Sequence, residues 1–327
     1  MGSMDFQLGV ANESSFNTPT TANRFFECES EGIEESYGRT EGDPLRLGAG
    51  FARGDRFTPY FEGASGSVQM AVMTKGFGFW LRHMTGSTPT TTGPAETTVY
   101  THTAAEGDLY GDSFTLQVNR PFHPAGTNQP FTYAGCKITE WTLSNSVEGN
   151  LLLDLNIDAA SVATATALAT ASYPTGMENL SWVGGLITIG GTNVDVTEIS
   201  LKVDNGLKTD RRFIRQDAAK KEPTSSRRKA EFSLKCDFES LAMRAYAASL
   251  TAAGAKATFT ATWKGPTLLG STIYPEFTIT APVGRFDSWK GTTGGTEAIE
   301  QELSGEIRYD GTSSPLTLTY KSADATA

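Results

Sequence analysis

Histidine and cysteine are scarce in this chain of 327 residues, which contains three of each. The histidines, His83, His102 and His123, form no H-E-x-x-H motif and share no metal-ligand spacing with a cysteine. We therefore expect no metal and no other cofactor. The cysteines are odd in number and far apart, which favours reduced, packed thiols in a protein that folds in a cytosol. They are Cys28, Cys136 and Cys236.

Long apolar runs and enzyme signatures are also missing. No stretch approaches the length of a transmembrane helix, and the opening MGSMDFQLGVANESSF lacks the basic and hydrophobic regions of a signal peptide, so we expect no membrane partner. GASGS (Gly63–Ser67) misses the nucleophile elbow, and GAGFARG (Gly48–Gly54) places Arg53 where a dinucleotide-binding loop has its last glycine. Without a Walker A motif either, the sequence predicts a protein that is not an enzyme.

Positive charge is in deficit, with a formal net charge of -10 and a pI of about 4.9. This balance argues against a dedicated nucleic-acid binder, because acidic surfaces repel phosphate. The 34 glycines, many threonines and short apolar alternations are typical of a β-rich fold. One stretch is an exception to the acidic character: LKTDRRFIRQDAAKKEPTSSRRKAEF, Leu207–Phe232.

An order of elements occurs twice along the chain: strand, long polar arm, strand, helix. Superposing the two occurrences aligns Val68 with Phe232 and Phe77 with Leu241, and Gly86 stands where the first helix would end. The first occurrence comprises Asn23–Ser30, Glu31–Gly66 and Ser67–Gly86; the second comprises Thr197–Gly206, the basic stretch and Ala230–Leu250.

Strands further along agree with this duplication. Asp112–Arg120 corresponds to Ala257–Gly265, and the strand–turn–strand pattern of Ala134–Ser161 corresponds to Thr280–Gly311. We predict two tandem β-sandwich domains, 1–170 with an arm at 31–66 and 171–327 with an arm at 204–229, each with one flanking helix. The small-residue segment between them is a linker or a short helix. The alternative is that the chain contains no duplication, because any β-rich chain with two helices can be made to look repetitive.

The two arms differ in charge, and arms of this length are normally functional or disordered. Complementary charge steers association and fixes its register, so we interpret the arms as contacts between subunits; the alternative is that each run is a solvated face. The acidic residues are Glu27, Glu29, Glu31, Glu34 and Glu35. The basic residues are Lys208, Arg211, Arg212, Arg215, Lys220, Lys221, Arg227, Arg228 and Lys229.

Most of the chain resembles the tail tube proteins of long-tailed bacteriophages. The resemblance is clearest in GVANESSFNTPTTANRFFECESEGIEESYG, GSVQMAVMTKGFGFWLRHMTG, TVYTHTAAEGDLYGDSFTLQV and YAGCKITEWTLS. It implies small β-sandwiches whose inner sheets join into a β-barrel on oligomerisation, and an arm that reaches neighbouring subunits. It also implies hexameric rings stacked into a tube for DNA ejection; a duplicated subunit needs only three chains for a pseudo-hexameric ring.

The same resemblance implies partners and a location. The partners are further copies of the chain, the terminator, the baseplate or tip proteins, and the tape measure protein in the lumen. Assembly takes place in the host bacterial cytoplasm, and the product is the virion tail. Double-stranded DNA passes without specific binding, so strands that face the lumen should be polar and the basic arm should face a neighbouring subunit or ring.

Two other classes of protein remain as alternatives. A nucleic-acid-binding module would need aromatic side chains among the basic residues, and only Phe213 lies there. Another β-rich virion component, such as a minor capsid, tail or spike protein, would share the composition rich in glycine and threonine. It would have no reason for two equivalent arms.

Overall fold

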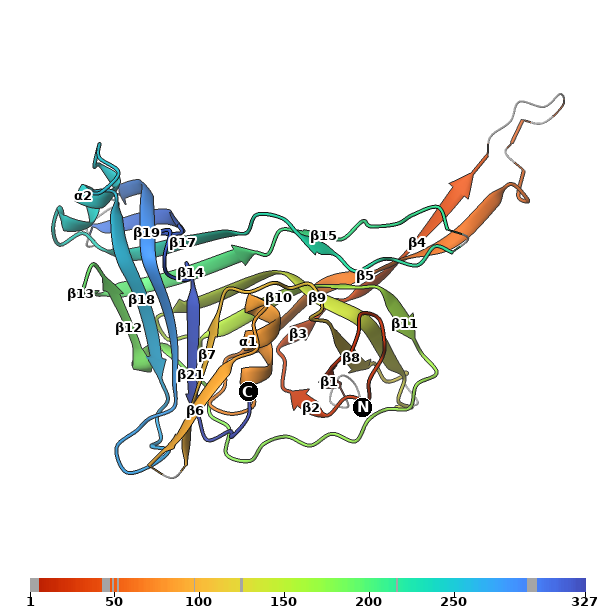
Figure 1. Cartoon of the computed structure of the whole chain (residues 1–327), viewed down its shortest axis with the longest axis horizontal. Helices are drawn as coiled ribbons and strands as arrows, with labels where there is room; N and C mark the ends of the chain where they lie inside the picture. Colours follow the sequence, from red (N-terminus) through yellow and green to blue (C-terminus); the bar gives the residue numbers. More distant parts are fainter. Residues whose placement is uncertain are drawn as a thin grey trace.

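A computed structural model describes residues 6–327 except 43–47, 49, 52, 97, 124–125, 216 and 293–298. Part of the glycine-rich stretch Gly48–Gly54 and part of the first predicted arm lie outside the described residues. Within the described part the chain is mainly β, with two α-helices, which confirms the expected fold class at this level. Figure 1 shows the chain with its strands and helices labelled.

The first half of the chain is defined here as the elements from β1 to β11. They are β1 (Gln7–Asn12), β2 (Arg24–Phe26), β3 (Ser30–Glu31), β4 (Glu34–Glu41), β5 (Phe57–Ala71), α1 (Gly78–Thr85), β6 (Thr90–Ala95), β7 (Val99–Ala105), β8 (Phe114–Asn119), β9 (Pro130–Ser146), β10 (Leu152–Ala159) and β11 (Ser161–Ala163). Much of the predicted polar excursion at 31–66 is therefore a β-ribbon rather than a loop, because β4 and β5 pair along it.

The second half runs from η2 to β21. It comprises the 3-10 helix η2 (Trp182–Gly184), β12 (Gly185–Ile189), β13 (Thr192–Val194), β14 (Val196–Asp204), β15 (Leu207–Lys208), β16 (Thr224–Ser225), β17 (Lys229–Asp237), α2 (Ala242–Ala247), β18 (Lys256–Lys264), β19 (Glu276–Thr292), β20 (Glu300–Ile307) and β21 (Thr317–Ser322). Residues 164–177, between the halves, belong to no strand or helix. That segment is thus extended chain, and the short helix considered from its sequence does not form.

An inner sheet crosses both halves in the order β4–β5–β10–β9–β14–β17–β20–β19. Its strands alternate apolar and polar residues, as in LLDLNIDA of β10, so one face packs on the core and the other faces outward. The antiparallel β9–β14 pair joins the halves, with Leu143 opposite Leu201. Among the described residues the ends of the sheet do not pair, so the single chain contains no closed barrel.

Outer strands complete each half. In the first half, β9 pairs with β8 and β11, β8 pairs with β1, and β1 pairs with β2. In the second half, β19 pairs with β18 and β21, β18 pairs with β12, and β12 pairs with β13. β9 and β19 each have 17 residues, and their two ends pair with different neighbours, so each belongs to both the inner and the outer strands. β7 of the first half also pairs with β21 of the second, which ties the halves together a second time.

The strand pairings follow the same order in both halves. β1–β8, β8–β9, β9–β10 and β10–β5 are matched by β12–β18, β18–β19, β19–β20 and β20–β17. The registers of the long hairpins also agree. Trp141 lies opposite Leu155, and Trp289 lies opposite Leu303, so the difference in residue number is the same for both partners (289 − 141 and 303 − 155).

A bulge occurs at the same place in both hairpins. The register skips Thr139 in the first and Asp287 in the second, and these two positions differ by the same offset as the paired residues (287 − 139). Through these pairings Val68 of β5 occupies the position of Leu234 in β17. The hydrophobic pattern instead aligned Val68 with Phe232, two residues earlier. A two-residue shift keeps every side chain on the same face of a strand, so the pattern alone does not reveal it.

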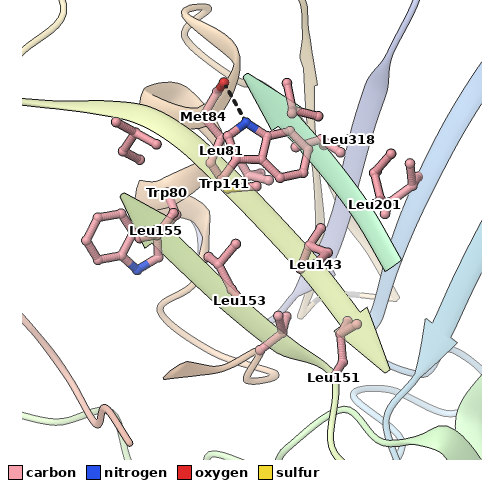
Figure 2. Packing of buried hydrophobic residues seen from close by; sticks show 14 of the residues in the cluster. Trp80, Leu81, Met84, Trp141, Leu143, Leu151, Leu153, Leu155, Leu201 and Leu318 are labelled. Atoms are coloured by element: carbon pink, nitrogen blue, oxygen red, sulfur yellow. Dashed lines mark hydrogen bonds between the residues drawn. The ribbon is translucent and has the colours of Figure 1, made fainter. Parts of the chain in front are cut away.

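The two helices contribute unequally to the core. α1 buries Trp80, Leu81 and Met84, and the carbonyl of Met84 accepts a hydrogen bond from Trp141 Nε1 at 3.2 Å (Figure 2). Gly86 ends this helix with φ of 81°, as its place in the sequence predicts. α2 has no buried residue, and Leu241, expected on its packed face, is largely exposed. The helix instead contacts the core through Met243, Tyr246 and Ala247, and the ring of Tyr246 stacks on Phe286 of β19 with ring centroids 5.1 Å apart.

Candidate assembly surfaces

Two edges of the inner sheet are open among the described residues. β4 pairs only with β5, and the second part of β19, Phe286–Thr292, pairs only with β20. Exposed edges present unpaired N–H and C=O groups that can pair with another chain. The two edges lie at opposite ends of the strand order, so one chain can pair through both at once.

The outward face of the inner sheet carries a row of five serines on five neighbouring strands. Each serine lies directly opposite the next, and Ser288 and Ser304 are 2.6 Å apart through their hydroxyl oxygens. Along the sheet the row runs Ser144, Ser200, Ser233, Ser304 and Ser288. These side chains make a short, uncharged polar band, which offers no fixed charge to a passing ligand.

Charged rows flank the serine row, and lysines and arginines stand beside carboxylates within them. One row runs Thr142, Lys202, Glu231, Glu306 and Arg285, and the other runs Ser146, Glu198, Lys235, Glu302 and Lys290. Lys202 binds Glu140 at 2.8 Å, and Lys235 binds Glu300 at 2.9 Å. The face is therefore polar, and part of its charge is already paired within the chain.

The two predicted arms begin as equivalent ribbons. Arg39 lies opposite Pro59 in the first arm, and Leu207 lies opposite Ser225 in the second. The ribbons then take different courses. The first projects away from the body of the molecule, whereas the second runs back across the first half towards β4 and β5 (Figure 1).

Lys220 anchors the second arm to the first half. Its ammonium lies 2.5 Å from both carboxylate oxygens of Asp158, at the end of β10, and the lysine is only 9% exposed. Burial raises the pKa of the Asp158 carboxyl, and the neighbouring Lys220 and Arg212 oppose that rise. This buried, bidentate pair holds the arm in one position.

Glu222 supplies a second anchor two residues later. Its carboxylate binds Lys137 Nζ at 2.6 Å and accepts a hydrogen bond from the backbone N–H of Gly111, also at 2.6 Å. The Lys137 side chain is fully buried and also donates to the carbonyl of Asp112 at 3.1 Å. Burial lowers the pKa of Lys137, and Glu222 opposes the shift by stabilising the charged form. Removing Glu222 would leave a buried ammonium without its carboxylate.

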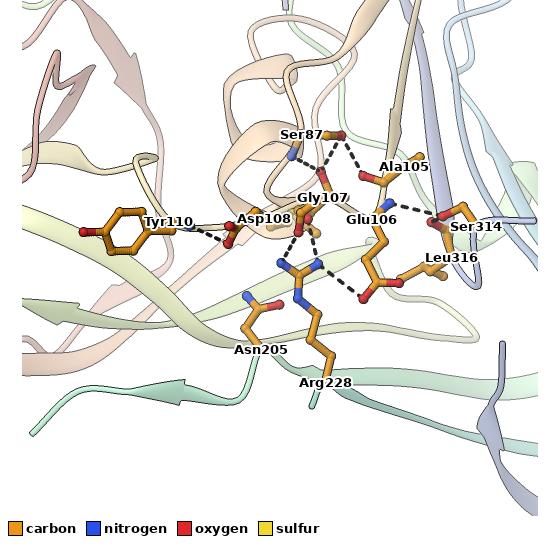
Figure 3. Close-up of polar contacts among 12 residues, drawn as sticks. Ser87, Ala105, Glu106, Gly107, Asp108, Tyr110, Asn205, Arg228, Ser314 and Leu316 are labelled. Atoms are coloured by element: carbon orange, nitrogen blue, oxygen red, sulfur yellow. Dashed lines mark hydrogen bonds and ion pairs between the residues drawn. The ribbon is translucent and has the colours of Figure 1, made fainter. Parts of the chain in front are cut away.

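Arg228 fixes the base of the second arm. Its guanidinium donates to the carbonyls of Thr85 and Gly107, both at 2.7 Å, and lies 3.9 Å from the carboxylate of Glu106 (Figure 3). Thr85 is the last residue of α1, where the unpaired carbonyls of a helix favour a cation. Beside this contact lies a groove of about 700 Å³ between the halves.

Five of the other basic residues of the arm contact groups of their own chain. Arg212 and Arg211 donate hydrogen bonds to the carbonyls of Glu62 and Glu222, and Arg215 and Lys229 bind the carboxylates of Asp217 and Glu231. The ammonium of Lys221 lies over the ring of Phe213. Lys208 and Arg227 are exposed. Much of the predicted basic surface is therefore engaged with its own chain, and Lys220, Arg212 and Arg228 reach the first half.

The predicted acidic residues lie at the base of the first arm: Glu34 and Glu35 begin β4, and the other three precede it. Glu31 is nearly buried and binds Arg120 at 2.5 Å, and Glu35 accepts a hydrogen bond from the hydroxyl of Tyr37. The remaining three, Glu27, Glu29 and Glu34, are exposed. Among the described residues no ion pair joins the acidic set to the basic set.

Sequence reasoning missed the partners of the second arm. Asp158 stands in a strand whose alternation marks it as outward-facing, but nothing local indicates a lysine 62 residues away. Lys137 gives no sign of full burial, because the neighbours that bury it come from distant segments. Such contacts depend on tertiary placement rather than on spacing.

Within the described ranges, no group of three or more histidines, cysteines and acidic residues is placed to hold a metal ion. No helix among these residues is long and apolar enough to cross a membrane. The prominent features are instead open sheet edges, a projecting ribbon and a polar sheet face. These features define a structural β-protein suited to association with further chains.

Comparison with known families identifies the kind of assembly. The family model described as phage tail tube protein matches residues 5–307, and the chain belongs to this family. No curated protein sequence matches the chain. The protein is thus a structural subunit of a phage tail tube and a component of the virion tail, which confirms the resemblance and the function expected from the sequence.

Proposed function

We propose that three copies of this chain close one ring of the tail tube, and that each chain supplies two equivalent halves. The proposed domains are residues 1–170 and 171–327, with the boundary inside the extended segment 164–177. The observation that carries this proposal is the constant difference in residue number between the β9–β10 and β19–β20 hairpins, bulge included. Independent strands would have no reason to share a register and a bulge.

The β9–β14 pair is the template for the contact between chains. β19 corresponds to β9, and the β3–β4 edge corresponds to β14, so the open edge of β19 pairs with β4 of the next chain. Lys202 lies opposite Thr142 in the template. By the same register Glu34 of one chain faces Lys290 of its neighbour, and both are exposed in the single chain. Opposite charges facing each other across strands support the pairing.

The template also sets the size of the tube. A path through directly opposite residues starts at Trp289, crosses β20, β17 and β14, and reaches Asn145 of β9. Trp141 is the residue of β9 that corresponds to Trp289 of β19. The path therefore reaches the equivalent strand four residues away from the equivalent residue (145 − 141), and each half adds four residues to the shear of the barrel. Six halves of four inner strands give a barrel of 24 strands with a shear of 24. Strand spacings of about 4.8 Å and rises of about 3.3 Å then give a tilt of about 35° and a backbone diameter of about 45 Å.

Such a barrel has an open channel, because barrels of about 16–18 strands already enclose water. The polar face of the inner sheet, with its serine row, lines this channel in the proposed ring. Double-stranded DNA passes along it without specific binding, since the face offers few free cations to hold phosphate. The proposed partners are further copies of the chain, the terminator, the tip proteins and the tape measure protein, with assembly in the host cytoplasm.

Electron microscopy of purified tubes tests this proposal. End-on class averages should have threefold symmetry with six similar lobes around a barrel of about 45 Å backbone diameter. Sixfold rings of whole chains are the alternative, and they would contain twice as many inner strands and a barrel of about 90 Å. That result would overturn the duplication and the stoichiometry while leaving the tube role intact.

A further inference from the structure

We propose that the first arm of one chain docks on the second half of its neighbour through two ion pairs, Arg53 with Glu306 and Asp55 with Arg285. This inference rests on the proposed ring and names the surface that receives the projecting arm. The second arm already makes the corresponding contact inside the chain, where Lys220 binds Asp158 and Glu222 binds Lys137.

The receiving surfaces match in position and in charge. Asp158 lies next to Lys137 across β10 and β9, as direct cross-strand partners. Glu306 and Arg285 are direct partners across β20 and β19, and they follow Asp158 and Lys137 by the same offset that relates the two hairpins (306 − 158 and 285 − 137). An acid on the first strand and a base on the second therefore stand at the same place in both halves. Only the first of these surfaces is covered by an arm of its own chain.

The arms carry the same order of charges at positions on their ribbons that differ by one residue. Lys220 and Glu222 are two residues apart, and so are Arg53 and Asp55. Lys220 precedes the paired residue Ser225 of its ribbon by five positions (225 − 220), and Arg53 precedes Pro59, the equivalent paired residue, by six (59 − 53). The order base, any residue, acid thus recurs within one position of the same place on the ribbon.

The first arm can reach this surface. In the ring its ribbon starts at β4 of one chain, beside β19 of the neighbour, and Glu306 lies on β20, one strand further. Two strand spacings amount to about 10 Å, and a few extended residues cover that distance. The ribbon pairs out to Glu41 and Phe57, well clear of its own half, and it projects from the body of the molecule (Figure 1).

Docking exchanges ion pairs rather than stranding charges. In the single chain Arg53 binds Asp55 at 2.6 Å, and both side chains are about half exposed. Arg285 binds Asp287 at 2.6 Å, also at the surface. Glu306 also has cationic neighbours in its own chain: Lys229 at 3.7 Å, Arg285 at 3.4 Å, and Arg308. Lys229 keeps Glu231 as a partner, so Arg53 can take its place beside Glu306.

Charge-swap variants of the full-length chain test the contact. Arg53→Glu and Glu306→Arg should each raise the protein concentration needed for ring formation by about tenfold, measured by light scattering and negative-stain microscopy. Combining them should restore assembly close to the wild-type level. Lys264→Glu is the control, since it reverses an exposed cation on the outer strand β18, away from both the arm contact and the proposed seam, and it should assemble normally.

The Asp55→Arg and Arg285→Asp pair provides a second swap, independent of any folding defect caused by Glu306→Arg. Thermal melting of each variant identifies such a defect directly. Failure of both swaps to restore assembly, or normal assembly of Arg53→Glu, would overturn the docking proposal. The ring proposal is judged separately by the symmetry of wild-type tubes, so the two can fail independently.

Discussion

Lys220→Met should release the second arm from the first half of its own chain. The lysine and its partner Asp158 have side-chain exposures of 6% and 14%, and the ammonium contacts both carboxylate oxygens at 2.5 Å. Methionine keeps the length of the side chain but leaves the buried carboxylate without its cation. Breaking a buried pair by removing one partner typically costs about 3–5 kcal/mol. Because Asp158 retains some solvent contact, we expect about 3 kcal/mol.

The assay is urea unfolding followed by tryptophan fluorescence, together with limited trypsin digestion. Arg215 and Lys221 are exposed sites on the arm, so its release should make cleavage there faster. Lys229→Met is the control, because its pair with Glu231 is about half exposed on both sides and should contribute about 0–1 kcal/mol.

A double variant separates the ion pair from simple packing. Lys220→Met combined with Asp158→Leu removes both charges, and such apolar replacements are often neutral or stabilising, so most of the lost stability should return. A loss below about 1 kcal/mol for Lys220→Met, with trypsin cleavage at the wild-type rate, would refute the reasoning. The arm would then be held by other contacts or would move freely.

Three further predictions concern pH, the seam between chains and close packing. Burial lowers the pKa of His83 to about 3, so the folded protein keeps this histidine neutral. The unfolded chain takes up a proton there below about pH 6.5, so the free energy of unfolding decreases as pH falls from 6.5 towards 3, by up to about 1.4 kcal/mol per pH unit. His83→Gln should flatten the melting temperature between pH 6.5 and 5 relative to wild type, and an unchanged slope would contradict the burial argument. Glu34→Cys with Lys290→Cys should form disulfide-linked trimers under oxidation, with dimers as intermediates, seen on a non-reducing gel; each single variant should remain monomeric on that gel. Gly305→Ala would press a methyl group into the carbonyl oxygen of Arg285 and should cost about 1–3 kcal/mol in chemical denaturation, whereas Gly32→Ala has open space around it and should cost far less.

Much of the sheet could be predicted because its signals are local. β17 alternates apolar and polar residues along its whole length, and β10 and β14 do so from Leu153 and Glu198 onwards, so their core faces follow from the sequence alone. α1 likewise combines apolar residues at helical spacing with Gly86 at its end. α2 shows the limit of such patterns, because the face marked by the helical spacing of Leu241 and two alanines is exposed, and Met243, Tyr246 and Ala247 make the contacts with the core instead.

The arms could be located from the sequence but their partners could not. Charge runs mark an exposed or interacting segment, yet the choice between a neighbouring chain and the chain itself depends on where the ribbon travels. Lys137 and Glu222 come from opposite halves of the chain, and each looks like an ordinary surface residue in its own segment. The basic arm is consequently a contact within the chain at Lys220 and Glu222.

In the proposed ring, two halves joined in one chain reduce the number of contacts that must form between molecules. Within one chain the β9–β14 seam and the second-arm contact form between tethered segments, whose effective concentration lies in the millimolar range for short connections. A ring of six separate halves needs six seams between molecules, whereas three fused chains need three. The fused halves also become free to diverge, since the arm of the second half always meets the same partner. In the proposed ring the first arm recognises another molecule, in agreement with its projection from the body, whereas the second arm runs across the first half of its own chain (Figure 1).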